Sequence, residues 1–243
     1  MKSLQFFKPQ TNKEISGESE SCPQVFTEIS SEPFVRGFLH RPANPNGGGL
    51  VLTHGAGSNC QARLLIAMAD AFCAAGNVVL RIDLPFRQDR PYGPPGPGDA
   101  KRDRAGLKNA LAALKNQGHG RTFIGGHSYG GRQASMLLAE QPENEPALAA
   151  GLLLLSYPLH PPRRPDQLRT QHLFHLRTPT LFVHGTNDPF GTIAEIEQAL
   201  KLIPAKTKLL PVEGGHDLGF KGKTKRHGLP ENVLAEFQGF FAD

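Results

Sequence analysis

The sequence predicts an α/β fold built on a parallel sheet, and the first reason is an alternation of two apolar patterns. From Leu50 onward, short apolar runs alternate with segments whose apolar residues recur at helical spacing. Such alternation is typical of parallel strands covered by helices on both faces. The second reason is a glycine-rich turn with a central serine, which joins one of these runs to one of these helices. The length of 243 residues suits a single domain of this class with a full core, and no internal repeat divides the chain.

The chain begins with residues 1–22, which are polar and aperiodic, so we expect them to be poorly ordered. The folded domain is predicted to span residues 23–243. Its first two strands, at 25–29 and 34–39, are joined by a short turn and predict an antiparallel hairpin. The later strands are expected at 50–53, 78–82, 122–126, 152–155, 180–183 and 208–212.

Predicted helices fill the intervals between these strands, and their ends carry specific signals. Gly76 and Gly118 follow the first two helical patterns, where glycine favours a helix end. Thr192 and Glu195 form a capping box at the start of a later helix. Pro230 marks the start of the last helix, whose apolar residues form one closing face.

Two long intervals are predicted to be irregular. Residues 84–98 are rich in proline and glycine, so we expect neither helix nor strand there. Residues 156–178 are the longest interval between strands, with a short helix expected near 167–174. This second interval could overhang a site as a minimal lid, and both intervals are expected to shape the pocket.

Ser128 is the candidate nucleophile. It lies in Gly126-His127-Ser128-Tyr129-Gly130, between the strand at 122–126 and a helix that we expect to run to about Pro142. A strand, this pattern and a helix in succession form the context of a nucleophile elbow, in which glycines avoid crowding the neighbouring backbone. A loop is the alternative for the pattern alone, because the chain has 27 glycines.

A nucleophilic serine needs a histidine base that a carboxylate orients, and both occur downstream after predicted strands. Asp188 is the candidate acid and His216 the candidate base, in the order serine, acid, histidine. Glu213 and Asp217 flank His216 and remain alternatives for the acid. His184 is the strongest rival for the base, whereas we expect His127 to point away from the nucleophile.

The segment from His54 to Ser58 follows the strand at 50–53 and consists mostly of small residues. Small residues leave backbone amides accessible, so the amide of Ala56 can join that of Tyr129 as a two-donor oxyanion hole. Taken alone, the segment could be any glycine turn.

Composition limits the classes of function. The net charge of +5 does not by itself imply nucleic-acid binding, and the basic run at 221–227 is expected to be a solvated loop. No apolar run approaches the roughly 18 residues of a membrane span, and the first residues lack the apolar core of a secretion signal. The odd set of Cys22, Cys60 and Cys73 has no metal-ligand spacing. We therefore expect a cytoplasmic protein with free thiols, without membrane or nucleic-acid partners.

The interval from about Val25 to Phe241 resembles the α/β-hydrolase superfamily, on its dienelactone-hydrolase-like side. The motifs Thr53–Gly57, Gly125–Arg132 and Ser156–Pro162 are similar to those of a branch of uncharacterised bacterial hydrolases. That branch is related to a regulatory subunit of the nonspecific lethal histone-acetyltransferase complex. The resemblance implies an eight-stranded, mostly parallel sheet with a minimal cap or none, and a Ser-Asp-His triad without a cofactor or metal. Dienelactone hydrolases themselves use cysteine where this chain has Ser128, so their substrate does not carry over.

The function expected is a serine hydrolase that cleaves a carboxylic ester or thioester of a small molecule through an acyl-enzyme. The alternatives are a non-catalytic scaffold with the same fold and a nucleic-acid binder that uses the basic run. Five arginines of the two irregular intervals could face the pocket and favour an anionic acyl substrate, or they could be solubilising surface. They are Arg81, Arg87, Arg90, Arg163 and Arg164.

Overall fold

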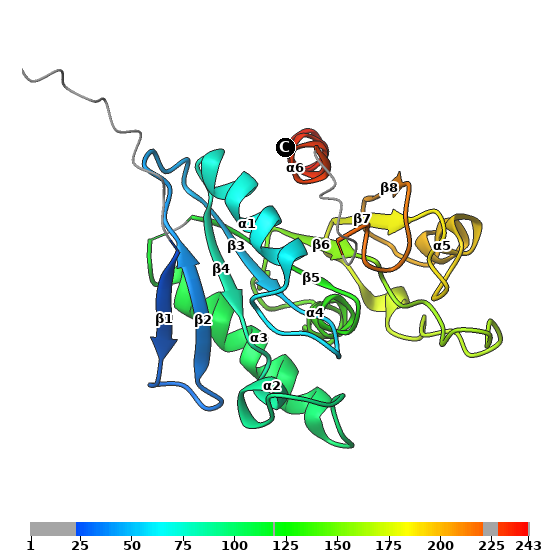
Figure 1. Ribbon diagram of the computed structural model, residues 1–243, viewed down its shortest axis with the longest axis horizontal. Helices are drawn as coiled ribbons and strands as arrows, with labels where there is room; N and C mark the ends of the chain where they lie inside the picture. The colour runs from blue at the N-terminus through cyan, green and yellow to red at the C-terminus, as the bar shows by residue number, and fades with distance from the viewer. Residues whose placement is uncertain (1–22, 119, 221–227, 243) are drawn as a thin grey trace, which may run out of the picture.

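The computed structural model describes residues 23–118, 120–220 and 228–242. The expected disorder of 1–22, the thiol of Cys22 and the basic run at 221–227 lie outside these residues. Within them the chain forms one eight-stranded sheet in the order β1-β2-β4-β3-β5-β6-β7-β8 (Figure 1). The first two strands run antiparallel to their neighbours, and all the other pairings are parallel.

The observed strands confirm the predicted positions to within one or two residues at their ends. Their bounds are β1 Gln24–Glu28, β2 Val35–His40, β3 Gly48–Thr53, β4 Val78–Ile82, β5 Arg121–His127, β6 Gly151–Leu155, β7 Thr180–Gly185 and β8 Thr207–Val212. The central strands β4 and β6 are buried along their whole length, as expected for parallel strands covered on both faces.

Helices cover both faces of the sheet (Figure 1). One face carries α1 (Arg63–Ala74) and α6 (Leu229–Phe241), and the other carries α3 (Asp99–Lys115), α4 (Tyr129–Ala139) and α5 (Ile193–Leu200). The predicted capping box of α5 is present, because Glu195 N donates to Thr192 Oγ1 (3.2 Å) while Glu195 Oε2 accepts from Thr192 N (2.8 Å). No helix within the described residues is long and apolar enough to cross a membrane.

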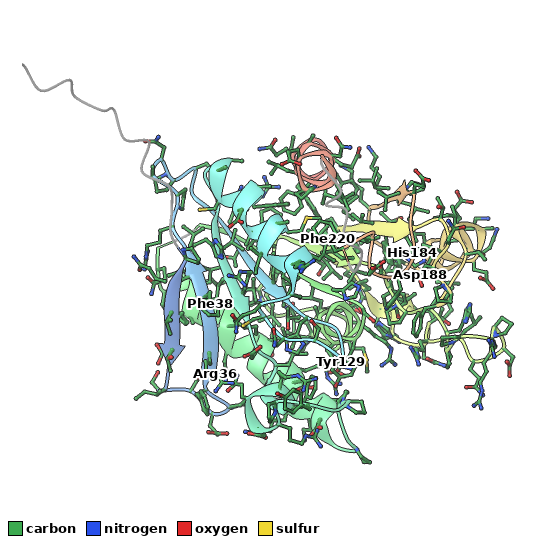
Figure 2. All side chains as sticks on the ribbon, viewed as in Figure 1. Arg36, Phe38, Tyr129, His184, Asp188 and Phe220 are labelled. Atoms are coloured by element: carbon green, nitrogen blue, oxygen red, sulfur yellow. The ribbon has the colours of Figure 1, made fainter. Side chains whose placement is uncertain are left out.

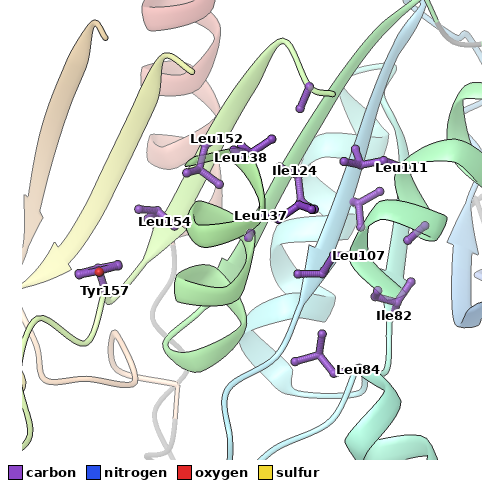
Figure 3. Packing of buried hydrophobic residues seen from close by; sticks show 14 of the residues in the cluster. Ile82, Leu84, Leu107, Leu111, Ile124, Leu137, Leu138, Leu152, Leu154 and Tyr157 are labelled. Carbon is purple, nitrogen blue, oxygen red and sulfur yellow. The ribbon is translucent and has the colours of Figure 1, made fainter. Parts of the chain in front are cut away.

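Two apolar clusters hold the layers together. Figure 3 shows part of the first, in which leucines of α3 and α4 pack against Ile124 and Leu152 of the sheet. The second unites α1 and α6, with the ring centroids of Phe72 and Phe237 4.9 Å apart. Burying side chains of this size contributes about 2–3 kcal/mol each, so both helix layers are held firmly against the faces of the sheet.

The two irregular intervals differ from expectation. Residues 85–89 form a short helix, α2 (Pro85–Asp89), which begins at a proline, where the missing amide costs no hydrogen bond. In the second interval the only regular element is a 3-10 turn, η1 (Leu173–His175), instead of a helix at 167–174. Helical periodicity in a proline-rich segment is too short to identify either element reliably.

Parallel strand registry determines where the site lies. Thr53 of β3 pairs with Gly126 of β5, and Gly185 of β7 pairs with Val212 of β8. The loops that follow β3, β5, β7 and β8 therefore emerge at the same edge of the sheet. In open α/β sheets this carboxyl edge is where ligands bind.

Candidate active site

Ser128 lies at the sharp turn between β5 and α4. Its backbone is strained, with φ 52° and ψ −118°, and the helix begins at the next residue. A Cβ on Gly126 would lie 2.7 Å from the amide nitrogen of Gly131, so only glycine permits this close approach of strand and helix. The turn therefore presents the serine hydroxyl beyond the end of the strand.

Ser128, His216 and Asp188 form one hydrogen-bonded chain. The Ser128 hydroxyl donates to His216 Nε2 (2.7 Å), and His216 Nδ1 donates to Asp188 Oδ2 (2.8 Å) and lies 3.0 Å from Oδ1. The carboxylate thus selects the imidazole tautomer whose Nε2 can accept a proton from the serine. Of the acids considered from the sequence, Asp188 is the one hydrogen-bonded to this nitrogen, rather than Glu213 or Asp217.

Asp188 is held in a closed environment at the end of β7. Its side chain has no exposed surface, and Oδ1 accepts a second hydrogen bond from the amide of Phe190 (2.9 Å). His184 lies beside it (Figure 2), with Nε2 3.6 Å from Oδ2 and donating to the carbonyl of Gly191 (2.8 Å). Burial lowers the pKa of His184, so the imidazole is neutral and ties together the two ends of the acid loop.

The loop that carries His216 is tied to the acid loop by backbone hydrogen bonds. Asn187 N donates to Gly214 O (2.8 Å), and Thr186 N donates to Val212 O (2.8 Å). Gly214 adopts φ 136°, a region that residues with a side chain rarely occupy. The glycines before His216 therefore let this side chain fold back over Ser128.

His127 does not point away from the site, contrary to the expectation. Its Nε2 donates to the backbone carbonyl of His216 (2.7 Å), and the two ring centroids are 5.1 Å apart. The residue before the nucleophile thus supports the backbone of the candidate base. No pattern around His127 indicates this contact, because the two residues are 89 positions apart.

The turn at 54–58 lines the same cavity as Ser128. Hydrogen bonds to the carbonyl of Gly55 set the orientation of the peptide between Gly55 and Ala56. The Gly55 carbonyl accepts from His54 Nδ1 (2.9 Å) and from Ser58 N (3.1 Å). His54 Nε2 accepts from Leu84 N (3.1 Å), which leaves the proton on Nδ1, and burial lowers the pKa of His54 to about 4. Because a trans peptide is planar, the amide of Ala56 points away from the fixed carbonyl of Gly55.

A cavity of about 420 Å³ opens over these groups. Five segments line it: the turn at 54–58, the start of α1 at 62–65, the elbow at 127–128, the loop with Phe190, and the loop with His216, Asp217 and Phe220. Residues of 84–98 and 156–178 are absent from the lining, so the expectation that those loops shape this pocket is wrong for the described residues. Phe190 and Phe220 line the cavity instead, and no motif in the sequence indicated them.

The family profile described as "Alpha/beta hydrolase domain" matches residues 47–237, which is most of the chain. The chain belongs to this family.

Solved structures of similar fold agree with this α/β-hydrolase assignment. Dienelactone hydrolase from Anabaena variabilis has 22% identity and a TM-score of 0.68, over 92% of this chain and 98% of that chain. An esterase from Pyrococcus furiosus has 15% identity and a TM-score of 0.68, over 96% of each chain. Est1E from Butyrivibrio proteoclasticus has 15% identity and a TM-score of 0.64, over 90% of this chain and 99% of that chain. At these identities the likeness concerns the fold.

The five arginines considered for the pocket mouth from the sequence of this α/β-hydrolase chain lie elsewhere. Arg81 and Arg87 are buried and donate to backbone carbonyls, and Arg90 pairs with Asp99. Arg163 and Arg164 are exposed but do not line the cavity. The arginine that does line it is Arg63, at the first position of α1.

Cys60 and Cys73 are both buried. Burial is also the main cause that raises the pKa of Cys60 to about 12. In the described part of the chain, no group of three or more His, Cys, Asp or Glu side chains could hold a metal ion.

Proposed function

We propose that this α/β-hydrolase chain is a serine hydrolase that cleaves a carboxylic ester or thioester of a small molecule through an acyl-enzyme. The observation that carries the proposal is the hydrogen-bonded chain from Ser128 through His216 to the buried Asp188, of which Ser128 and His216 line the cavity. Nucleophile, base and orienting acid at hydrogen-bond distance are the arrangement that such chemistry requires.

In the first step, Ser128 Oγ bonds to the acyl carbon while its proton passes to His216 Nε2. The electrons of the carbonyl double bond move to its oxygen, and Asp188 stabilises the imidazolium through Nδ1. Collapse of the tetrahedral intermediate breaks the bond to the leaving alcohol or thiol, which takes the proton from His216. Water then attacks the acyl-serine by the same route, and the carboxylic acid leaves.

The amides of Ala56 and Tyr129 are proposed as the oxyanion hole. Tyr129 N is the first amide of α4, so it has no acceptor within the helix and lies at the positive end of the helix dipole. The amide of Ala56 is oriented by the two hydrogen bonds on the Gly55 carbonyl. Preorganised donors of this kind favour the charge that develops only in the transition state.

The cavity suits a small acyl group. Its lining includes apolar side chains of Leu64, Leu65, Phe190 and Phe220, and its volume of about 420 Å³ lies at the small end of ligand sites.

We further propose that the substrate carries a negative charge which Arg63 recognises. Arg63 forms none of the ion pairs found among the described residues, and it begins a helix whose first turn has no acid. A cation is unfavourable at this end of a helix, so stability does not account for it. Asp217 also lines the cavity, and its Oδ1 accepts a hydrogen bond from Gly219 N (3.2 Å). Recognition of the substrate therefore depends on where its charge lies relative to Arg63 and Asp217.

Labelling with a fluorophosphonate tests the nucleophile. The wild-type protein should be labelled and should hydrolyse members of a panel of acyl esters and thioesters. Ser128→Ala should lose both activities while it keeps the wild-type melting temperature, because removal of one half-exposed hydroxyl leaves no core cavity. A folded wild-type protein that neither reacts with the probe nor turns over any ester would instead support the alternative of a non-catalytic scaffold.

A further inference from the structure

Arg87 is a buried cation whose hydrogen bonds all go to backbone carbonyls. Its side chain belongs to α2, and the residue is only 5% exposed. Nε donates to Ser58 O (2.7 Å), and Nη2 donates to Ala56 O (2.8 Å) and Gly93 O (2.9 Å). Nη1 donates to Arg90 O (3.1 Å).

Burying the guanidinium in this way has a high cost in free energy for a residue with a purely structural role. Arg87 forms none of the ion pairs found within the described residues, so no carboxylate offsets the loss of water around the guanidinium. The guanidinium is instead stabilised by its hydrogen bonds to carbonyls and by the ring face of Phe86, whose centroid lies 4.9 Å from the guanidinium carbon. The planar fork of arginine is suited to hold several acceptors in one fixed geometry.

Two of the four carbonyls that Arg87 holds, those of Ala56 and Ser58, belong to the turn that carries one proposed oxyanion donor. The orientation of the Ala56 amide depends on the two peptide groups on either side of Ala56. The preceding peptide is fixed through the Gly55 carbonyl, by His54 and Ser58 N. The following peptide is fixed through the Ala56 carbonyl by Arg87, which also holds the carbonyl of Ser58. Arg87 therefore completes the restraint on this amide without lining the cavity.

The neighbouring residue of α2 restrains the second donor. Phe86 packs edge-on against the ring of Tyr129, with centroids 5.7 Å apart. Buried Asp103 joins the same two residues, because Oδ1 accepts from Phe86 N (3.1 Å) and Oδ2 accepts from Tyr129 Oη (2.7 Å). The short helix α2 thus contacts both the turn at 54–58 and the first residue of α4.

We propose that Arg87 is a positioning residue for the oxyanion hole, and that α2 is the shared anchor of its two donors. This inference rests on the proposed function. Arg87 contacts neither the cavity nor the triad, so it acts only through the Ala56 peptide. Its loss should weaken binding of the tetrahedral state more than binding of the substrate.

The experiment compares Arg87→Ala and the milder Arg87→Lys with a matched control, Arg90→Ala. Arg90 lies in the same segment, but its side chain faces Asp99 and only its backbone carbonyl contacts Arg87, so the substitution keeps that acceptor. For each variant, kcat and KM are measured on one ester, together with the inhibition constant of a trifluoromethyl ketone that forms a tetrahedral adduct on serine. Melting temperature reports the fold.

Replacement of Arg87 should leave the Ala56 amide less restrained, so we expect kcat to fall on the order of 10–100-fold while KM stays nearly unchanged. Affinity for the trifluoromethyl ketone should fall by the same factor as kcat/KM. Millimolar methylguanidinium should restore part of the activity of Arg87→Ala but none of the activity of Ser128→Ala. Arg90→Ala should keep wild-type values throughout.

Wild-type kcat in folded Arg87→Lys and Arg87→Ala would overturn the inference, as would equal losses of affinity for substrate and ketone. If Arg87→Ala does not fold, Arg87→Lys alone decides between these results. A wild-type protein that is inactive and unlabelled contradicts the proposed function itself, which distinguishes that failure from failure of the inference.

Discussion

Neighbouring groups restrain the side chains of Ser128, His216 and Asp188 through hydrogen bonds. Asp188 shows this most clearly, because its fully buried carboxylate accepts from the imidazole of His216 and from the amide of Phe190. An ionised carboxylate is costly to bury unless it has such donors. The same bonds fix the direction in which the acid presents its second oxygen to His216.

Replacement of Asp188 by asparagine should lower kcat by roughly four orders of magnitude, because an amide group can stabilise the wrong tautomer of the base. The comparison variants are Glu213→Gln and Asp217→Asn, neither of which removes the bond to His216 Nδ1. Steady-state kinetics on one ester measures all three. A larger loss in either comparison variant would contradict the assignment of Asp188 as the acid.

The proposed recognition of a charged substrate by Arg63 is tested by removing its charge. Arg63→Gln should lower kcat/KM for an ester with a carboxylate on its acyl chain and leave its neutral isostere nearly unaffected. For the wild type, the preference for the charged ester should shrink as salt rises, because ions screen an exposed guanidinium. Equal kcat/KM of the wild type for the two esters at low ionic strength would remove the idea.

At the scale of elements, the site depends on close contact between β5 and α4. Glycines at both ends of the elbow allow the strand carbonyls, the helix start and the turn at 54–58 to approach within distances that a side chain would prevent. The strained backbone of Ser128 persists because these contacts determine its conformation.

Gly126→Ala should therefore destabilise the elbow and reduce activity together. Its Cβ would lie 2.7 Å from Gly131 N and 2.9 Å from the carbonyl carbon of Gly130, which are backbone atoms that cannot give way cheaply. We expect a loss of at least 2 kcal/mol, on the order expected for overpacking, in the free energy of unfolding. Urea denaturation measures it.

The matched control is Gly239→Ala in α6, where a Cβ meets no atom within 4 Å. There the substitution should stabilise the protein by about 0.5–1 kcal/mol, since alanine favours the helix. Similar stabilities for the two variants would contradict the steric explanation of the elbow.

At the scale of the whole molecule, several histidines are kept neutral by burial. Burial is the first cause that lowers the pKa of His40, His54 and His172 to about 4 in each case. Between pH 6.5 and 4 the unfolded chain therefore binds protons on these residues that the folded protein does not. The stability that these three histidines contribute is therefore fully present above pH 6.5 and is lost as the pH decreases through this window.

His172→Gln tests this dependence, because His172 is bound to the hydroxyl of Ser135 and is remote from the cavity lining. Each such histidine contributes up to about 1.4 kcal/mol per pH unit to the slope of unfolding free energy against pH. The variant should show a smaller slope than the wild type between pH 6.5 and 4. Identical slopes for wild type and His172→Gln would contradict the assignment.

What could be predicted from the sequence is the part of the structure that local chemistry encodes. Strand positions follow from apolar runs such as 152–155, and the start of α5 follows from the side-chain bonds that Thr192 and Glu195 make within one turn. Ser128, Asp188 and His216 could be singled out as candidates because each follows a strand, and the carboxyl ends of parallel strands share one edge.

The parts that only the tertiary structure decided depend on side chains that reach across the fold. Arg87 lies in a segment predicted to be irregular, yet it holds carbonyls 29 and 31 residues earlier in the chain. His127 supports a carbonyl 89 residues later, and Phe190 and Phe220 enclose a cavity expected from other loops. Local periodicity records which face of an element is buried, but the partner of a long polar side chain is determined by which elements pack beside it.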